Sequence, residues 1–338
     1  MGEQFKWNPS EDRMGQMMRQ AVYMEDQVTL EHLAKQKADL EARDETGATP
    51  LHIAATQNRP AIIAWLLGRR ASVLTMDKEG FSALAWACVR GHSSAVKELL
   101  AGQADTEAVM TTREKTALSL SAERGHLNCI QELLAGKASL EQTNADGGSL
   151  LMCAAHTGEA DIMAALLEKK MNPNQADNEG WTALMHSVTA PVIAVGGEFG
   201  EKRVHLEGAI GRKSCMELLL LHKADVNAQA LDGLSSLIIA AGRDRGMAVK
   251  RLLEFRAQVN HATSRGQTAL LMAAAHDLPD VVRMLIMASA DVNHTNAKNC
   301  SALSLAEKYD CKEVVALLKR AGAVEAKGKK KKKKGKKK

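Results

Sequence analysis

The 338-residue sequence is poor in aromatic side chains and contains only six prolines. Aromatic residues make up 3% of the chain, so a core must be built mainly from the Leu, Ala, Val, Ile and Met among the 45% of hydrophobic residues. No uncharged apolar run approaches the roughly 20 residues of a membrane-spanning helix. The first twenty residues carry Glu3, Glu11 and Asp12 and lack an apolar stretch. We therefore expect neither a transmembrane segment nor a secretory signal.

Cysteine and histidine lack the spacing of metal or disulfide frameworks. The six cysteines are Cys88, Cys129, Cys153, Cys215, Cys300 and Cys311. None forms a Cys-x-x-Cys pair, and the eleven histidines are scattered. We interpret the cysteines as free thiols of a reducing compartment, mostly facing a core, rather than as disulfides or zinc ligands. We expect no metal, no cofactor and a cytoplasmic or nuclear location.

Catalytic motifs are also missing. The chain has no Gly-x-Ser-x-Gly, no phosphate loop, no His-Glu-x-x-His and no dinucleotide-binding glycine pattern. Its acidic residues recur at turn positions, where a turn needs them. His92 and His126 likewise recur at one helix-start position. We predict that the protein is not an enzyme and has no catalytic residues.

A repeated phrase is present instead, which reads Gly-Ala-Thr-Pro-Leu-His-Ile-Ala-Ala at residues 47–55. Its hydroxyl residue returns at Thr49, Ser82, Thr116, Ser149, Thr182, Ser235, Thr268 and Ser301. The steps are 33 or 34 residues, with one step of 53. A second phrase, Ala-Asp-Val-Asn, ends at residues 227 and 293. A fixed period of this size indicates a stacked repeat array rather than two or three separate domains.

Each copy predicts a turn followed by two helices. An Asp-to-Gly turn, such as Asp44–Gly47 or Asp177–Gly180, precedes a Thr or Ser that caps a short helix. A second helix ends in Leu-Leu, and in several copies a glycine such as Gly102 ends that helix. We predict an all-α repeat solenoid of about nine helix-turn-helix repeats joined by β-turn hairpins, with residues 14–42 as a degenerate first repeat. The predicted parts are a flexible lead-in (1–13), the repeat domain (14–323) and a disordered polylysine tail (324–338).

The period and the two phrases resemble the ankyrin repeat family over roughly residues 14–323. The resemblance implies an extended concave surface, with binding residues at the turn tips and on the exposed side of each first helix. The histidine of the family phrase is present only at His52. Other copies place Ala85, Ser119, Met152, Met185, Ile238, Leu271 and Ser304 there. These changes remove a polar contact to the turn, so we expect a less rigid array.

One copy is interrupted by about 20 extra residues between Met185 and Cys215, near 190–209. Gly196-Gly197 within this insertion is a hairpin signal. Long loops in compact folds are usually functional or disordered. The insertion is therefore either a mobile surface loop or an ordered contact finger.

The position just before the capping hydroxyl carries large apolar residues in three copies: Phe81, Trp181 and Leu234. We expect this position to face solvent, and exposed aromatic groups rimmed by charge mark partner sites. Alternatively, Phe81 and Trp181 pack onto neighbouring turns. Trp65 is predicted to lie in the core, and Trp86 between helices. The other predicted partner-binding residues are Lys78, Glu79, Arg90, Arg113, Lys115, Glu123, Arg124, Asn178, Glu179, Asp232, Arg243 and Arg265.

The C-terminal stretch is intensely basic. Residues 327–338 hold ten lysines and no acid, so removing those ten charges from the net +5 leaves −5 for residues 1–326. The predicted electrostatic residues are Lys329, Lys330, Lys331, Lys332, Lys333 and Lys334. Such a run binds nucleic acid or anionic surfaces nonspecifically, or serves as a nuclear localisation patch. A passive solubilising tail and a translated poly(A) stretch are the alternatives.

We predict a non-enzymatic scaffold or adaptor that binds a partner protein on its concave face. A nuclear, RNA- or chromatin-associated regulator tethered by the basic tail is the first alternative. A substrate-recruiting subunit of a ubiquitin ligase or another enzyme complex is the second, and it would need a recruiting motif outside the repeats.

Overall fold

The computed structural model describes residues 13–109, 115–189 and 214–324. These residues contain eighteen α-helices and no β-sheet, which confirms the predicted all-α repeat solenoid. The predicted insertion at 190–209, the lead-in before residue 13 and the lysine tail lie outside the described residues. The chain divides into two compact units, Met1–Ala154 and Ala155–Lys338.

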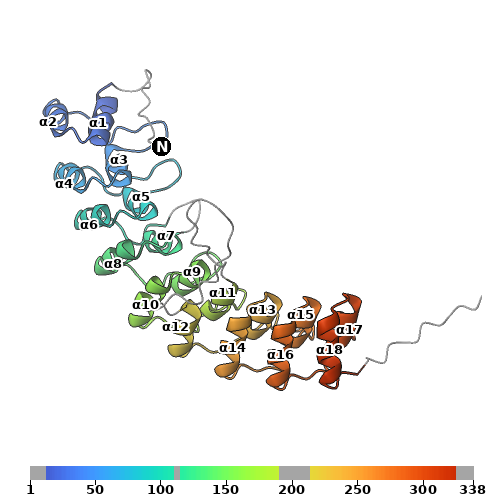
Figure 1. Cartoon of the computed structure of the whole chain (residues 1–338). Coiled ribbons are helices and arrows are strands. Elements are labelled where there is room, and N and C mark those ends of the chain that lie inside the picture. The colour runs from blue at the N-terminus through green and yellow to red at the C-terminus, as the bar shows by residue number, and fades with distance from the viewer. Residues whose placement is uncertain (1–12, 110–114, 190–213, 325–338) are drawn as a thin grey trace, which may run out of the picture. The chain divides into compact units, whose positions relative to one another are not determined.

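The first unit stacks short helices in two rows (Figure 1). First helices of successive repeats, α1, α3, α5 and α7, contact one another, and so do the second helices α4, α6 and α8. The helices are α1 (Arg13–Met24), α2 (Gln27–Lys35), α3 (Pro50–Thr56), α4 (Pro60–Gly68), α5 (Ala83–Arg90), α6 (Ser93–Ala101), α7 (Ala117–Glu123) and α8 (Leu127–Ala135); α9 (Leu150–Thr157) crosses into the second unit.

The second unit repeats the arrangement. Its first helices α11, α13, α15 and α17 contact one another in order, and α14, α16 and α18 form a second row, drawn below them in Figure 1. The helices are α10 (Ala160–Glu168), α11 (Ala183–Thr189), α12 (Cys215–Leu221), α13 (Ser236–Gly242), α14 (Gly246–Glu254), α15 (Ala269–Ala275), α16 (Pro279–Met287), α17 (Ala302–Lys308) and α18 (Lys312–Arg320).

Six of the eight periodic hydroxyl residues cap the first helices, as predicted. The Thr49 hydroxyl lies 2.9 Å from the His52 ring instead, and the buried Thr182 hydroxyl has no hydrogen-bond partner among the described residues. The Ser82 hydroxyl accepts a hydrogen bond from the Ala85 amide at 3.2 Å, and the Thr268 hydroxyl accepts one from the Leu271 amide at 3.3 Å. Each bond satisfies one of the amides that a helix N-terminus leaves without a partner. The repeating Thr or Ser therefore has a local structural cause.

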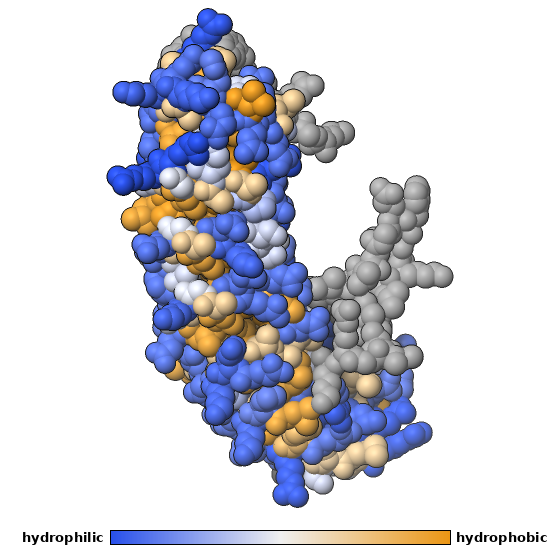
Figure 2. Space-filling model, turned by 90° about the vertical axis from the view of Figure 1, so that its left-hand side faces the viewer, coloured by the Kyte–Doolittle hydropathy of each residue, from blue (hydrophilic) through white to orange (hydrophobic). Residues whose placement is uncertain are grey.

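The core consists of aliphatic side chains with very small neighbours. Leu51, Leu84 and Leu118 are at most 2% exposed, and Ala54 and Ala87 are fully buried, so that consecutive first helices approach closely. Four of the six cysteines are buried as predicted. Burial raises the pKa of the Cys88 thiol to about 12. On the face drawn in Figure 2, apolar side chains form patches separated by hydrophilic ones.

Trp65 is not a core residue. Its ring is half-buried on α4, where its indole N–H donates to the Glu31 carboxylate at 2.7 Å. The Arg69 guanidinium lies 4.0 Å from the centre of the ring. The indole N–H needs a polar partner, and this requirement holds the ring at the surface between the two charged groups.

Gly102 follows the last residue of α6, as predicted, but its role differs from that of a left-handed terminating glycine. Its φ is −80°, and the left-handed conformation falls on the next residue, Gln103, at +63°. A Cβ atom on Gly102 would lie 2.5 Å from the Leu67 side chain of the preceding repeat. The glycine therefore allows close packing between repeats rather than a special backbone conformation, and a larger residue would require the end of the Leu67 side chain to shift.

Seven copies of the repeat lack the histidine found at His52 and so lose its contact to the next turn. Histidines at a second position of the repeat restore part of this contact. His52 accepts from the Thr49 amide through Nδ1 at 3.2 Å, so its Nε2 carries the proton and donates to the Phe81 carbonyl of the next turn at 3.0 Å. In the second unit, His261 bonds the Gly233 carbonyl at 2.8 Å and His294 bonds the Gly266 carbonyl at 3.0 Å. These histidines also join neighbouring turns, so the expected loss of polar contacts is only partial.

Asparagines link the repeats of the second unit. The Asn227 carbonyl oxygen accepts from the Gln258 amide at 2.8 Å, and the Asn260 oxygen accepts from the Asp291 amide at 2.7 Å. The amide group of Asn260 also donates to the Ser289 carbonyl at 3.2 Å. Each asparagine therefore fixes the position of the following repeat with one or two hydrogen bonds.

We expect Asn260→Ala to lower the free energy of unfolding by about 1–2 kcal/mol, because it removes two hydrogen bonds to the next repeat. Urea unfolding followed by circular dichroism measures the change. The matched control is Gln258→Ala, since Gln258 enters the same network only through its backbone. Equal effects of the two substitutions would contradict a linking role for the Asn260 side chain.

Candidate functional site

In each unit, one turn contains an aspartate that positions an aromatic residue by accepting hydrogen bonds from the backbone. The Asp77 carboxylate accepts from the Glu79 amide at 3.0 Å and the Phe81 amide at 2.8 Å. Asp177 accepts from the amides of Glu179 and Trp181 at the same two distances. These bonds close the turn and fix the direction in which the aromatic side chain leaves it.

In the first unit, the aromatic side chain turns inward. The Phe81 ring stacks on Trp86 with 4.8 Å between ring centres and is 7% exposed. The indole N–H of Trp86 donates at 2.8 Å to the second carboxylate oxygen of Asp77. Leu120 of the next repeat packs against Phe81. The prediction that Phe81 faces solvent is therefore wrong, because Trp86 and the next repeat cover the ring.

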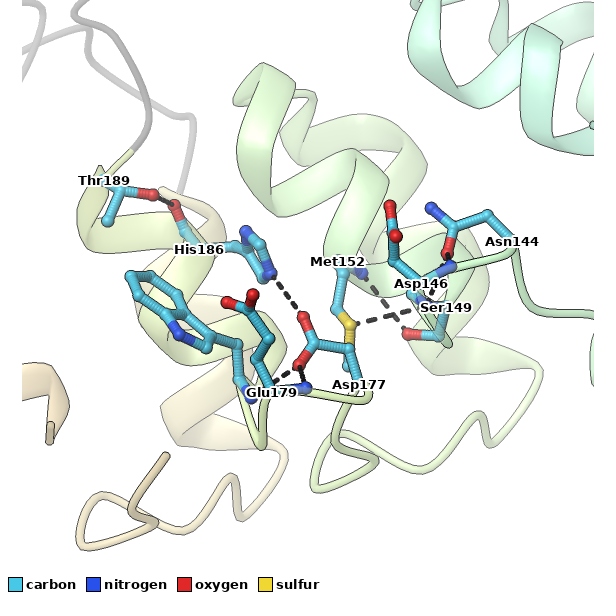
Figure 3. Close-up of polar contacts among 10 residues, drawn as sticks. Asn144, Asp146, Ser149, Met152, Asp177, Glu179, His186 and Thr189 are labelled. Carbon is cyan, nitrogen blue, oxygen red and sulfur yellow. Dashed lines mark hydrogen bonds and ion pairs between the residues drawn. The ribbon is translucent and has the colours of Figure 1, made fainter. Parts of the chain in front are cut away.

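In the second unit, a histidine replaces Trp86 and the arrangement is more open. The His186 Nε2 atom lies 3.5 Å from the second carboxylate oxygen of Asp177. The Trp181 ring centre is 5.4 Å from that of His186, which is 6.1 Å from that of His156. Figure 3 shows His186 and Asp177 pointing toward each other. We call Asp177, Trp181, His186 and His156 the Trp181 cluster.

The Trp181 cluster presents a surface. Trp181 is half-buried and His156 is exposed. The pKa of His186 is lowered, mainly by burial, although the hydrogen bond and the charge of Asp177 act in the opposite direction. The neutral imidazole is therefore the form that the folded state favours. The helix that carries His186, α11, ends at Thr189, the last described residue before the insertion.

The other predicted binding residues fall into three groups. Leu234 is half-buried. Lys115 and Glu123 are also half-buried and form a 2.7 Å ion pair with each other. The exposed residues are Lys78, Glu79, Arg90 and Arg124 in the first unit and Asn178, Glu179, Asp232, Arg243 and Arg265 in the second. Arg113 and Lys329–Lys334 lie outside the described residues, so their roles stay predictions.

The link between the turn aspartate and a ring nine residues later was not predicted. Trp86 follows Asp77 by nine residues, and His186 follows Asp177 by nine. The signal was present in the sequence as a shared offset. Only the structure shows that both ring nitrogens meet the carboxylate oxygen that the turn leaves available.

The described residues hold no cluster of three or more His, Cys, Asp or Glu that could bind a metal ion. None of the helices in the same part of the chain is both long and apolar enough to cross a membrane.

Comparison with protein families matches the description "Ankyrin repeats (3 copies)" over residues 18–110, 95–173, 118–192 and 206–296, which together cover most of the chain. The chain belongs to the ankyrin repeat family. Ankyrin repeats indicate a protein-interaction scaffold, which agrees with the predicted class of function.

Two curated relatives cover part of this ankyrin array. The B-cell lymphoma 3 protein homolog of Mus musculus is 28% identical over 196 residues, which are 58% of this chain and 33% of that protein. Palmitoyltransferase AKR1 of Lachancea kluyveri is 39% identical over 69 residues, 20% of this chain and 9% of that protein. The matched region thus spans a third or less of each relative.

We expect Phe81→Ala to destabilise the first unit of the ankyrin array by about 3 kcal/mol, because it removes a buried ring that packs on Trp86 and Leu120. Urea unfolding measures the loss. Phe81→Leu, which keeps much of the apolar volume, should cost about 1 kcal/mol. A negligible effect of the alanine variant would show that Phe81 is not part of the core.

We expect the stability of the second unit to depend on pH through His186. Burial lowers the pKa of His186 in the folded state below its ordinary value of 6.5. The unfolded chain therefore binds the proton more tightly than the folded chain, and protonation favours unfolding. The contribution of His186 is therefore complete above pH 6.5 and decreases as the pH falls below that value. In His186→Gln, the drop in unfolding free energy between pH 7.5 and 5.5 should be smaller than in the wild type. An identical drop would contradict this assignment.

Proposed function

We propose that this protein is an interaction scaffold whose partner binds the turn tips and first helices of the second unit, around the Trp181 cluster. The half-buried Trp181 side chain carries the proposal. Its backbone is fixed by Asp177, and its ring lies against His186. A side chain already held in place loses little conformational entropy on binding, and tryptophan is enriched among residues that dominate binding energy.

The contrast between Trp181 and Phe81 favours the second unit. Both residues occupy the same position of the turn, but Phe81 is buried by Trp86 and the next repeat. Trp181 is only half-buried. The apolar contact area that a partner needs is thus available at Trp181 and not at Phe81.

Polar residues that could surround such a contact lie nearby in the chain. Glu179 and Asp232 are exposed on consecutive turns, which are joined by the 2.9 Å bond from the Leu231 amide to the Glu179 carbonyl. Arg265 is exposed on the following turn. An apolar centre with a polar, solvent-accessible rim is the usual anatomy of a protein–protein interface.

We expect Trp181→Ala to reduce partner capture by at least tenfold, because truncating a central aromatic contact typically costs more than 1–2 kcal/mol of binding energy. Capture is measured by affinity purification from cell lysate with quantitative mass spectrometry, using the full chain. The matched control is Trp65→Ala, which removes a half-buried tryptophan from the second-helix row. Circular dichroism verifies that both variants fold. Equal capture by the wild type and a folded Trp181→Ala variant would refute the proposed site.

A further inference from the structure

The turn tips of the second unit form one continuous edge. The Leu231 amide donates to the Glu179 carbonyl at 2.9 Å, and the Ser264 amide donates to the Asp232 carbonyl at 3.0 Å. The Ala297 amide donates to the Arg265 carbonyl at 3.1 Å. Backbone hydrogen bonds thus join four consecutive tips. We call the residues 177–181, 230–234, 263–267 and 296–300 the tip edge.

Glycine is required in this edge for two reasons. Gly233 has a φ of +83°, a conformation that other residues adopt only with strain. A Cβ atom there would lie 2.9 Å from the Thr263 Cα atom of the next tip. The tips therefore sit in direct backbone contact, and their relative positions are fixed by the fold rather than by their exposed side chains.

Charge is ordered along the tip edge. The equivalent position of the four tips holds, in order, Glu179, Asp232, Arg265 and Lys298. All four side chains are exposed. Two negative charges are thus followed by two positive charges, one per repeat. Leu231, which is 81% exposed, lies in the acidic half next to Asp232.

Other charges near the first helices do not reverse this order. The first helices α13, α15 and α17 are each seven residues long. A charged residue lies beyond the C-terminal end of each: Arg243, Asp277 and Asp310, respectively. At 1.5 Å per residue these groups are about 10 Å along the helix from its tip, which is close to one screening length at physiological salt. Arg243 is positive and stands beside the exposed, negative Asp244, whereas Asp277 and Asp310 are negative. A ligand lying on the tips is therefore governed by the four tip charges.

The spacing of the tips fits an extended peptide. Neighbouring packed helices lie about 8–10 Å apart. An extended chain advances about 3.3 Å per residue, so roughly three residues span one repeat. Charged side chains three residues apart in a peptide can therefore meet successive tips.

We propose that the tip edge binds an extended segment of a partner protein with a defined charge order. Basic residues of the segment face Glu179 and Asp232, acidic residues face Arg265 and Lys298, and the interval is about three residues. An apolar residue between the two basic ones contacts Leu231. This inference rests on the protein-binding function proposed above and specifies the chemistry of the partner.

The first test uses two ten-residue fluorescent peptides and the full chain. The ordered peptide has Lys at positions 1 and 4, Leu at position 3, Glu at positions 7 and 10, and Ser elsewhere. The permuted peptide has the same composition, with Lys at positions 1 and 7 and Glu at positions 4 and 10. In fluorescence anisotropy at low salt, the ordered peptide should bind about tenfold more tightly, and the difference should shrink as salt is added. Equal affinities would overturn the proposed charge order.

The second test reverses the basic half of the edge. Arg265→Glu combined with Lys298→Glu should weaken binding of the ordered peptide about tenfold and create binding of a peptide with Lys at positions 1, 4, 7 and 10. The matched control is Lys250→Glu combined with Arg256→Glu, which changes the net charge equally but alters exposed residues off the tip edge. A gain for the all-lysine peptide in the control of the same size would overturn the proposal, since it would show nonspecific attraction.

The outcome separates this inference from the proposed function. If Trp181→Ala abolishes partner capture but the ordered and permuted peptides bind equally, only the charge order is wrong. If Trp181→Ala also leaves capture unchanged, the proposed site in the second unit is wrong as well.

Discussion

Each unit depends on the hydrogen bond between one turn and the next. A single repeat buries too little apolar surface to be stable alone, so its free energy comes from contact with its neighbours. The backbone bond from Lys78 to Thr46 in the first unit, and that from Ser264 to Asp232 in the second, set the offset between consecutive repeats. Once this offset is fixed, the first helices meet through small alanines and the second helices through leucines. At Gly102, for example, the end of α6 packs directly against the Leu67 side chain of the preceding repeat.

The two units reinforce this offset with different side chains at equivalent positions. The second unit uses neutral Asn227 and Asn260, whose carbonyl oxygens accept an amide of the next repeat. The first unit uses carboxylates. Glu41 accepts from the Ser72 amide at 2.7 Å, and Glu107 accepts from the Ser139 amide at 2.9 Å. Both chemistries supply an oxygen in the same place, but only the asparagine also has an N–H group that can donate to the next repeat, as Asn260 does to Ser289.

Interactions within one repeat, such as helix caps, were predictable from the sequence, whereas contacts between repeats were not. The capping role of Ser82 follows from its place before an apolar helix, because the amides it serves are three residues away. The directions of Phe81 and Trp181 do not follow in this way. The two share one position, and their exposure depends on whether Trp86 or His186 stands nine residues after the turn aspartate and on what the next repeat supplies. Trp65 has the same cause: its apolar position in the repeat predicts a core residue, but its partner Glu31 lies in another repeat.

Within each turn, some residues stabilise the backbone while others only expose their side chains. This separation explains how such an array can acquire a function without losing stability. Asp177 and Gly180 stabilise the backbone of the turn. The Asp177 carboxylate accepts hydrogen bonds from backbone amides, and Gly180 adopts a φ of +80°. Glu179 stands between them, and its side chain points outward while its carbonyl carries the link to Leu231. The same holds for Asp232 and Arg265, whose carbonyls bond the next tip. Because the side chains of Glu179, Asp232 and Arg265 take no part in these links, they can differ from repeat to repeat. The order of charge along the edge is therefore a property that folding does not dictate, and it is where this chain can encode the choice of a partner.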